Sequence, residues 1–175
     1  MLSYLLFTLI WTNLTHGLCS SIGNFSVVLV GGGLQDNNTV VWNEIVRLAG
    51  GPGSKIGVIS AASEDPCCDP DSSWIFYEKL FLYYGAKPYY INITVDTKEN
   101  NSNPKVISII RSMTGFFFGG GDQTKIILSL YNQADTIPSE ALYAIKNTLH
   151  RTGKKYTPHQ NTTRILVALK LRFFI

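Results

Sequence analysis

Charged residues are scarce in this chain. They make up 15% of its 175 residues, whereas hydrophobic residues make up 45%. Intrinsically disordered chains have the opposite balance, because they lack the apolar side chains needed to form a core. A chain of this length can bury one core. The composition therefore excludes a disordered chain and predicts one folded domain.

Histidine is also scarce, with three in the chain. His16 lies near the amino terminus, His150 lies on the polar side of an expected helix, and His159 lies near the carboxyl terminus. None of them is placed to act as a general base. No cluster of histidine, cysteine and carboxylate residues has the spacing of metal ligands. The sequence therefore predicts neither a metal site nor a cofactor.

Cysteine is limited to three residues, Cys19, Cys67 and Cys68. Because Cys67 and Cys68 are adjacent, they can join each other only through a strained ring. In an oxidising compartment their partners would be expected elsewhere in the chain, and none follows them. Two alternatives stay open, a free vicinal pair and a chain that lacks its other half.

The amino terminus has the features of a secretory signal peptide over residues 1–20. Residues 1–11 are an apolar run too short to span a bilayer, which takes about 20 residues. Small residues follow at Gly17, Cys19 and Ser20. We therefore expect a secreted or endomembrane-lumenal protein with no membrane segment after cleavage. Glycosylation sequons fit such a compartment; they lie at Asn24, Asn37, Asn92, Asn100 and Asn161.

The net charge of +3 is concentrated in the last 25 residues, which hold six basic residues and no acid. A basic tail can attract the phosphates of nucleic acid or of acidic lipid. The simpler interpretation is a tail whose composition has no binding role. We therefore expect no nucleic-acid partner.

Strand and helix patterns alternate at intervals of about 30 residues, as in repeated β-α-β units. Apolar runs at 27–30, 56–59 and 116–118 predict parallel strands covered on both faces, and residues 89–93, which begin with two tyrosines and include Asn92, predict a further strand. Apolar residues recur at helical spacing between these runs. In the second expected helix, Phe76, Leu80 and Tyr83 fall on one face. The sequence predicts an α/β fold, an open parallel sheet with helices on both faces.

The pattern changes after residue 153. Lys154, Lys155 and Pro158 stand where a fifth buried strand is due, and neither lysine nor proline suits such a strand. Residues 165–169 are an alternative strand after a longer loop. We favour a missing strand, and divide the chain into a signal peptide (1–20), a partial α/β domain (21–153) and a divergent basic tail (154–175).

Three turns are expected at the carboxyl edge of the sheet, where open α/β sheets bind ligands. Gly31, Gly32 and Gly33 follow the first strand, residues 60–63 follow the second, and residues 119–123 follow the fourth. Glycine turns can present backbone N–H groups to a phosphate, a carboxylate or a developing oxyanion. A dinucleotide site is disfavoured, because Asp36 and Thr124 stand where the fingerprint needs its last glycine.

The turn at 117–123 has the sequence Phe-Phe-Gly-Gly-Gly-Asp-Gln. It resembles the second glycine motif of the cyanophycinases, in the serine peptidase family that also holds the aspartyl dipeptidases. Residues 30–33 and 55–63 resemble the first two strand ends of that family, and the resemblance covers about 25–153. It implies a fold like that of class I glutamine amidotransferases, which is flavodoxin-like, and hydrolysis of β-aspartyl peptide bonds.

The resemblance also implies roles for particular residues. The N–H groups of Gly120 and Gly121 would help to form an oxyanion hole, and Asp122 with Gln123 would orient the substrate. The turns at 31–33 and at Ser63 would complete the cleft. The ligand would be a peptide or a small acidic molecule.

The chain departs from this family at the nucleophile. Members carry a serine in a Gly-Thr-Ser-Ala-Gly turn after the next strand, with a histidine further on, but no G-x-S-x-G occurs here. We therefore expect no catalytic residue, and an inactive, truncated form of a serine-type peptidase. The alternative is a secreted pseudoenzyme that binds an acidic or peptide ligand.

Overall fold

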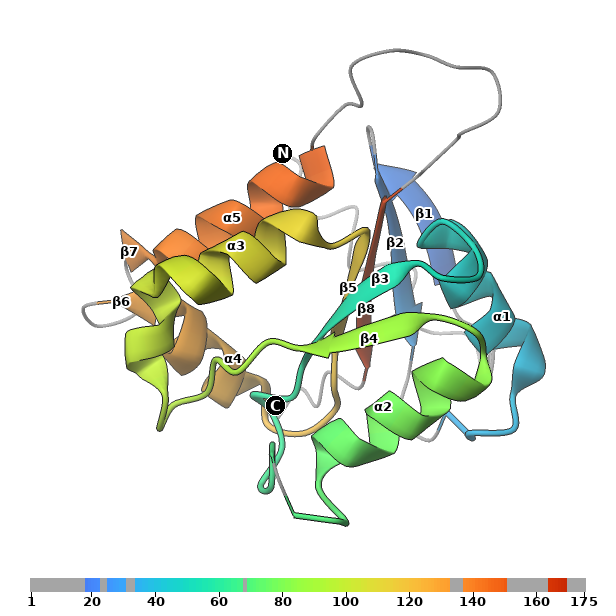
Figure 1. Ribbon diagram of the computed structural model, residues 1–175, viewed down its shortest axis with the longest axis horizontal. Helices are drawn as coiled ribbons and strands as arrows, with labels where there is room; N and C mark the ends of the chain where they lie inside the picture. Colours follow the sequence, from blue (N-terminus) through green and yellow to red (C-terminus); the bar gives the residue numbers. More distant parts are fainter. Residues whose placement is uncertain are drawn as a thin grey trace, which may run out of the picture.

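The computed structural model describes residues 18–22, 25–30, 34–67, 69–132, 137–150 and 164–169. A six-stranded sheet forms the centre, and helices cover both of its faces (Figure 1). Its strands are β1 (Leu18–Ile22), β2 (Phe25–Val30), β3 (Lys55–Ile59), β4 (Lys87–Tyr90), β5 (Gly115–Phe118) and β8 (Arg164–Leu169). The helices are α1 (Thr39–Leu48), α2 (Ser73–Tyr83), the short 3-10 helix η1 (Lys98–Ser102), α3 (Pro104–Ser112), α4 (Gln123–Leu130) and α5 (Glu140–His150). A separate two-stranded antiparallel sheet joins β6 (Tyr131–Asn132) to β7 (Ile137–Pro138).

The strand order of the central sheet is β1-β2-β8-β5-β3-β4. Every neighbouring pair from β2 to β4 is parallel, and β1 is antiparallel to β2 at one edge. A mixed α/β fold with a parallel sheet flanked by helices is therefore confirmed. Proline at the start of α3 fits the first turn of a helix, where its missing N–H is not needed.

The expected absence of a fifth parallel strand is wrong. Strand β8 pairs with β2 on one side and with β5 on the other, so it fills the middle of the sheet (Figure 1). Without it, β2 and β5 would each present a row of unpaired backbone N–H and C=O groups. The lysines and proline that argued against this strand, at 154–158, lie outside the described residues.

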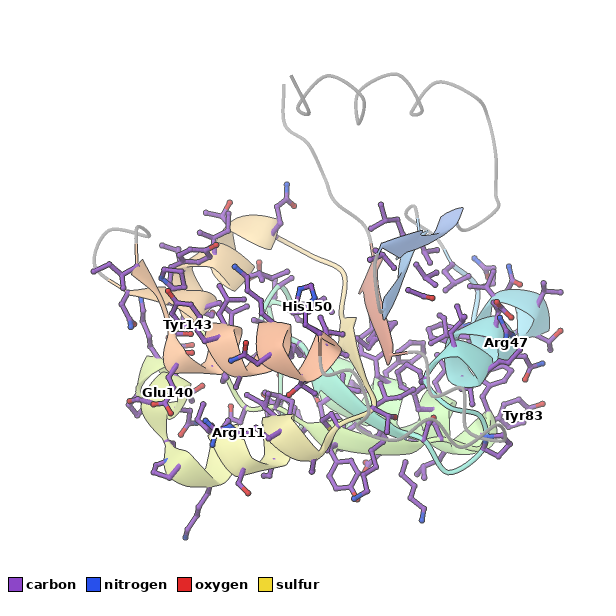
Figure 2. The ribbon with its side chains drawn as sticks, turned by 90° about the horizontal axis from the view of Figure 1, so that it is seen from above. Arg47, Tyr83, Arg111, Glu140, Tyr143 and His150 are labelled. Atoms are coloured by element: carbon purple, nitrogen blue, oxygen red, sulfur yellow. The ribbon has the colours of Figure 1, made fainter. Side chains whose placement is uncertain are left out.

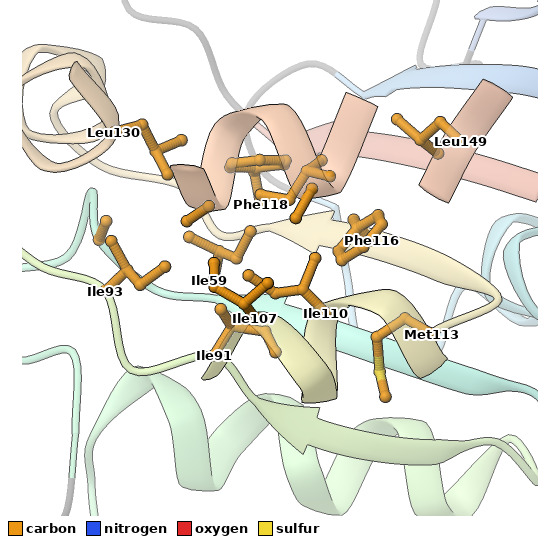
Figure 3. Close-up of a cluster of buried hydrophobic side chains, with 14 residues drawn as sticks. Ile59, Ile91, Ile93, Ile107, Ile110, Met113, Phe116, Phe118, Leu130 and Leu149 are labelled. Atoms are coloured by element: carbon orange, nitrogen blue, oxygen red, sulfur yellow. The ribbon is translucent and has the colours of Figure 1, made fainter. Parts of the chain in front are cut away.

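Helices pack on the two faces of the sheet through side chains that alternate along β5. Phe117 points to the face covered by α1 and α2, where its ring contacts Trp42 and Phe81. Phe116 and Phe118 point to the opposite face, because successive strand residues point in opposite directions. There they join Ile59 of β3, Ile107 and Ile110 of α3 and the inner side of α5 in a second core (Figure 3).

Helix α2 does not bury the face that its sequence suggests. Leu80 is buried, but Phe76 is 48% exposed and Tyr83 is 79% exposed. The helix instead turns Phe81, with Leu80, toward α1 and the sheet, and Tyr84 just beyond its end is buried with them. Apolar and aromatic residues occur on every side of α2, so their spacing alone does not identify the buried side.

Strand β1 overlaps the expected signal peptide. It pairs with β2 through partners such as Cys19 and Val28. Cleavage after Ser20 would remove three of its five residues. Residues 1–17, which contain the apolar run, lie outside the described residues. In the described part of the chain, no helix is both long and apolar enough to cross a bilayer.

Candidate functional site

The candidate site lies where β3 and β5 end side by side. The parallel register pairs Ile59 with Phe118, the last residue of each strand. The ladder continues beyond the strands, because the Gly119 N–H donates to the Ile59 carbonyl at 3.0 Å. The turn at 60–63 and the turn at 119–123 therefore lie together at the carboxyl edge of the sheet, which is the edge that the sequence predicts for them.

The first glycine turn, Gly31 with Gly32 and Gly33, lies outside the described residues. The strand before it is described. Val30 pairs with Leu169 of β8, and Phe118 pairs with Ala168. The carboxyl ends of β2 and β5 are thus on the same edge of the sheet, one strand apart.

Gly121 lies against the backbone of the neighbouring turn. Its φ of 139° is in the region that favours glycine. A Cβ on this residue would clash with the Ala62 carbonyl oxygen and lie 2.6 Å from its carbon. The next residue reinforces the contact, since the Asp122 N–H donates to the Ala62 oxygen at 2.8 Å. The two turns are therefore joined at the backbone in a way that requires glycine at 121.

Tyr77 of α2 covers the start of the glycine turn. A Cβ on Gly119 would lie 2.9 Å from Tyr77 Cε2. The Tyr77 hydroxyl accepts a long hydrogen bond, 3.4 Å, from the Gly120 N–H. Burial raises the pKa of Tyr77 above its usual value, so the group stays a neutral phenol. The N–H expected to stabilise an oxyanion thus has a hydroxyl oxygen in front of it.

Asp122 and Gln123 begin helix α4. The Asp122 carboxylate caps the helix, because its Oδ1 accepts from the Thr124 N–H at 2.8 Å. This hydrogen bond holds the pKa of Asp122 below its usual value, so the exposed side chain is a carboxylate near neutral pH. Gln123 is the first residue of the helix and is half-buried. Asp122 therefore has a structural role at the position where a substrate contact is expected.

Ser63 is held by the turn that contains it. Its hydroxyl lies 2.6 Å from the Ser73 hydroxyl and also bonds to the backbone of Asp65. Ser60, at the end of β3, is 1% exposed. Neither serine therefore has the exposed hydroxyl, activated by a base, that a nucleophile needs.

Lys125 supplies a positive charge at this edge. Its Nζ lies 3.0 Å from Glu64 Oε1 and donates to the Ser63 carbonyl at 3.4 Å. Neither Lys125 nor Tyr77 was found from the sequence. Lys125 follows the glycine motif by two residues and could have been found from its place in the first turn of α4. Tyr77 carries no local signal, because α2 reaches the turn only through the tertiary fold.

The histidines and cysteines of the described residues add no catalytic or metal-binding group to this site. His150 is the exposed last residue of α5, and the other two histidines lie outside the described residues. Cys67 is disulfide-bonded. No group of three or more histidine, cysteine or acidic residues that could hold a metal lies within the described ranges. Backbone N–H groups and the positive charge of Lys125 can together bind an anion at this site. Within the described residues, the site contains no nucleophile paired with a base.

The predicted glycosylation sequons differ in their surroundings. Asn37 is exposed in the turn before α1, whereas Asn92, in the loop that follows β4, and Asn100, in η1, are half-buried. Asn24 and Asn161 lie outside the described residues.

No protein-family model matches the sequence. Among solved structures, the fold is similar to the crystal structure of a peptidase from an acI-B1 Actinobacterium, with a TM-score of 0.54 and 15% sequence identity. The match covers 83% of this chain and 53% of the other, so this chain spans about half the length of that peptidase. The likeness shows a peptidase-like α/β fold, which is the part of the expected resemblance that the structure supports.

Proposed function

We propose that this chain is a cyanophycinase-like protein that binds a peptide or small acidic ligand at the ends of β3 and β5 without hydrolysing it. The fold would be of the class I glutamine amidotransferase type within the peptidase-like α/β architecture. The observation that carries the proposal is the joining of two turns, in which Gly121 lies against Ala62. A backbone this close to its neighbour supports a fixed turn that presents N–H groups at the sheet edge.

Binding is supported by the chemistry at this edge. Lys125 offers an ammonium group, and its partner Glu64 is 92% exposed, so a ligand carboxylate can replace it at little cost. Among the described residues, the Gly120 N–H is engaged only by a long hydrogen bond to the Tyr77 hydroxyl. A carboxylate that reaches both groups would form charge-assisted hydrogen bonds, which are stronger than the neutral ones it replaces.

Lack of catalysis is supported by the chain's own residues. The serine that the family carries directly after its next strand has no counterpart, because Leu169 ends β8 and Lys170 follows it in the sequence. In a serine protease, loss of the nucleophile lowers kcat about a millionfold. Hydrolysis of β-aspartyl dipeptides by this chain would therefore be undetectable.

The proposal is tested by calorimetry and by a hydrolysis assay with the dipeptide β-Asp-Arg. We expect binding without release of free arginine. Lys125→Met would weaken binding about 10- to 150-fold, because a hydrogen bond to a charged group contributes about 1.5–3 kcal/mol. Lys105→Met, an exposed change on α3, is the matched control and would leave binding unchanged. Hydrolysis of the dipeptide at enzymic rates would refute the proposal that the chain is inactive. Absence of binding would refute the proposed ligand class.

We also propose that the chain enters the secretory pathway. The apolar segment at 1–11 and the sequons that follow it support this location. The test is to express the chain in cultured animal cells and to determine the amino-terminal sequence of the protein recovered from the medium. A mature chain that begins at or before Leu18 would retain β1, whereas cleavage after Ser20 would remove most of that strand. Retention of the whole chain inside the cytosol would refute the location.

A further inference from the structure

A groove of about 530 Å³ lies between the start of α1 and helix α2. This volume is within the range of pockets that hold small ligands, about 300–1,000 Å³. The groove is separate from the turns at the ends of β3 and β5. It is lined by Asp36, Asn37, Thr39, Phe76, Lys79, Leu80, Tyr83 and Tyr84.

Two exposed aromatic rings form one side of this groove. Phe76 is 48% exposed and Tyr83 is 79% exposed, although both belong to a helix that packs on the sheet. Leu80, between them on the same face, is buried. Exposed apolar groups gathered in a groove are typical of a surface that another group covers.

The opposite side of the groove is held in place by α1. The Tyr84 hydroxyl donates to the Asp36 carbonyl at 2.8 Å, which ties the start of α1 to the end of α2. Asn38 caps α1, because its side chain accepts from the Val41 N–H at 3.2 Å. The groove is therefore preformed, with a fixed turn at its rim.

Asn37 lies on this rim and begins the sequon Asn37-Asn38-Thr39. Its side chain is exposed, and within the described residues no hydrogen bond engages that side chain. Thr39, the third residue of the sequon, is exposed at the first position of α1 and also lines the groove. The acceptor amide is thus accessible and lies beside the two exposed rings.

We propose that Asn37 carries an N-linked glycan whose first sugar lies in this groove against Phe76 and Tyr83. The C–H face of a pyranose packs on the electron-rich face of an aromatic ring, and its acetamide and hydroxyl groups meet polar partners. Asp36 and Lys79 supply such partners at the rim. A glycan on Asn37 accounts for both exposed rings, since it covers them while its outer sugars stay in water. The inference rests on the secretory location proposed above.

The other described sequons are engaged in folding. The Nδ2 of Asn100, the atom that would carry a sugar, donates to the Asn92 carbonyl at 2.8 Å. The Oδ1 of Asn92 accepts from Thr97 Oγ1 at 3.2 Å. Thr94, which completes the Asn92 sequon, is 6% exposed, and its Oγ1 lies 3.0 Å from Thr97 Oγ1. Both asparagines are half-buried and held in hydrogen bonds within this segment, so a glycan is less readily accommodated there than at exposed Asn37.

Site occupancy is measured on the full chain, preceded by an added cleavable signal peptide and expressed in cultured animal cells. The added signal makes entry into the lumen independent of the native amino terminus. Enzymatic release of N-glycans in H₂¹⁸O marks each former glycosylation site for mass spectrometry. We expect the mark at Asn37 and not at Asn92 or Asn100. An unmarked Asn37, or full marking of the other two, would overturn the inference. The same chain without the added signal tests the location separately.

Burial of the sugar is measured as the rate of glycan release by peptide N-glycosidase from the folded protein. The double variant Phe76→Ser with Tyr83→Ser should release its glycan roughly fivefold faster than wild type, if sugar stacking contributes about as much as an aromatic pair. After denaturation the two rates should be equal.

Tyr143→Ser is the matched control, because Tyr143 is 52% exposed on α5 and does not line the groove. Figure 2 shows Tyr83 and Tyr143 on opposite sides of the molecule. The control should release its glycan at the wild-type rate. Equal rates for the folded wild type and the double variant would overturn the placement of the sugar.

Discussion

The ring of Tyr77 occupies the space that a side chain on Gly119 would need, with Cε2 2.9 Å from the position of that Cβ. The same tyrosine accepts the Gly120 N–H through its hydroxyl. Tyr77 therefore restricts position 119 to glycine, and it also limits the access of a ligand to the Gly120 N–H. The link between α2 and the turn is made by packing between distant parts of the chain.

Tyr77 should stabilise the fold through its ring more than through its hydroxyl. The ring packs edge-on against Phe117 at a centroid distance of 4.7 Å, whereas the hydrogen bond is long. We expect Tyr77→Ala to lower the free energy of unfolding by about 3 kcal/mol and Tyr77→Phe to change it by less than about 1 kcal/mol. Urea denaturation measures both values. Equal losses in the two variants would assign the stabilisation to the hydroxyl instead.

Replacement of Gly121 should destabilise the protein far more than replacement of a loop glycine that also has a positive φ. Gly121→Ala forces a clash with the Ala62 carbonyl, and we expect a loss of about 2–4 kcal/mol from strain and displaced backbone. Gly53→Ala is the matched control, because Gly53 has a φ of 81° but no atom near its Cβ position. It should lose only about 1 kcal/mol. A similar stability for the two variants in thermal unfolding would contradict the tight joining of the turns.

Tyr90 should make the protein sensitive to alkali. Burial, with a smaller effect of the Asp65 carboxylate, raises the pKa of Tyr90 to about 12 from its usual 10. The unfolded chain loses this proton above pH 10 while the folded chain keeps it, so this contribution to stability is present below pH 10 and is lost between pH 10 and about 12. Tyr90→Phe should therefore flatten the decline in the free energy of unfolding at high pH.

At neutral pH the same variant should be harmless. The Tyr90 hydroxyl is buried and has no hydrogen-bond partner within the described residues. Its removal should leave the free energy of unfolding within about 1 kcal/mol of wild type or raise it slightly. Urea midpoints at pH 7 and pH 11 test both statements. If the difference in the free energy of unfolding between Tyr90→Phe and wild type is the same at both pH values, the pKa of Tyr90 is not raised by folding.

Strand β8 should be essential for the sheet. Ala168 pairs with Leu29 on one side and Phe118 on the other. Ala168→Pro removes an N–H and places a ring in a central strand, which should cost about 3 kcal/mol or more. Ala168→Val keeps the N–H and serves as the control, with a smaller loss expected. Amide exchange should also be as slow in residues 165–168 as in β3, and rapid exchange there would contradict the pairing.

Local pattern was enough for most elements. The runs near 27–30, 56–59 and 116–118 form β2, β3 and β5, because a strand buried on both faces needs uninterrupted apolar side chains. The position of the turns at 60–63 and 119–123 on one edge of the sheet also followed, since parallel strands end at the same edge. These inferences depend on spacing along the chain and on one general rule of sheet geometry.

The position of β8 and the side of α2 that is buried were not determined locally. Residues 165–169 are apolar, but only the open backbone groups of β2 and β5 select them as the strand between. The rings of Phe76 and Tyr83 are as apolar as those that α2 buries, and the contacts with α1 and the sheet decide which face is covered.

The amino-acid sequence by itself determined the α/β class, the glycine turn and the absence of a serine nucleophile motif, because each depends on residue type and short spacing. Only the tertiary structure decided that Tyr77 covers this turn, that Asp122 caps a helix and that Asn37 borders a groove. Those relationships join residues brought together by packing, and hydrophobic burial and backbone pairing act on the whole chain at once.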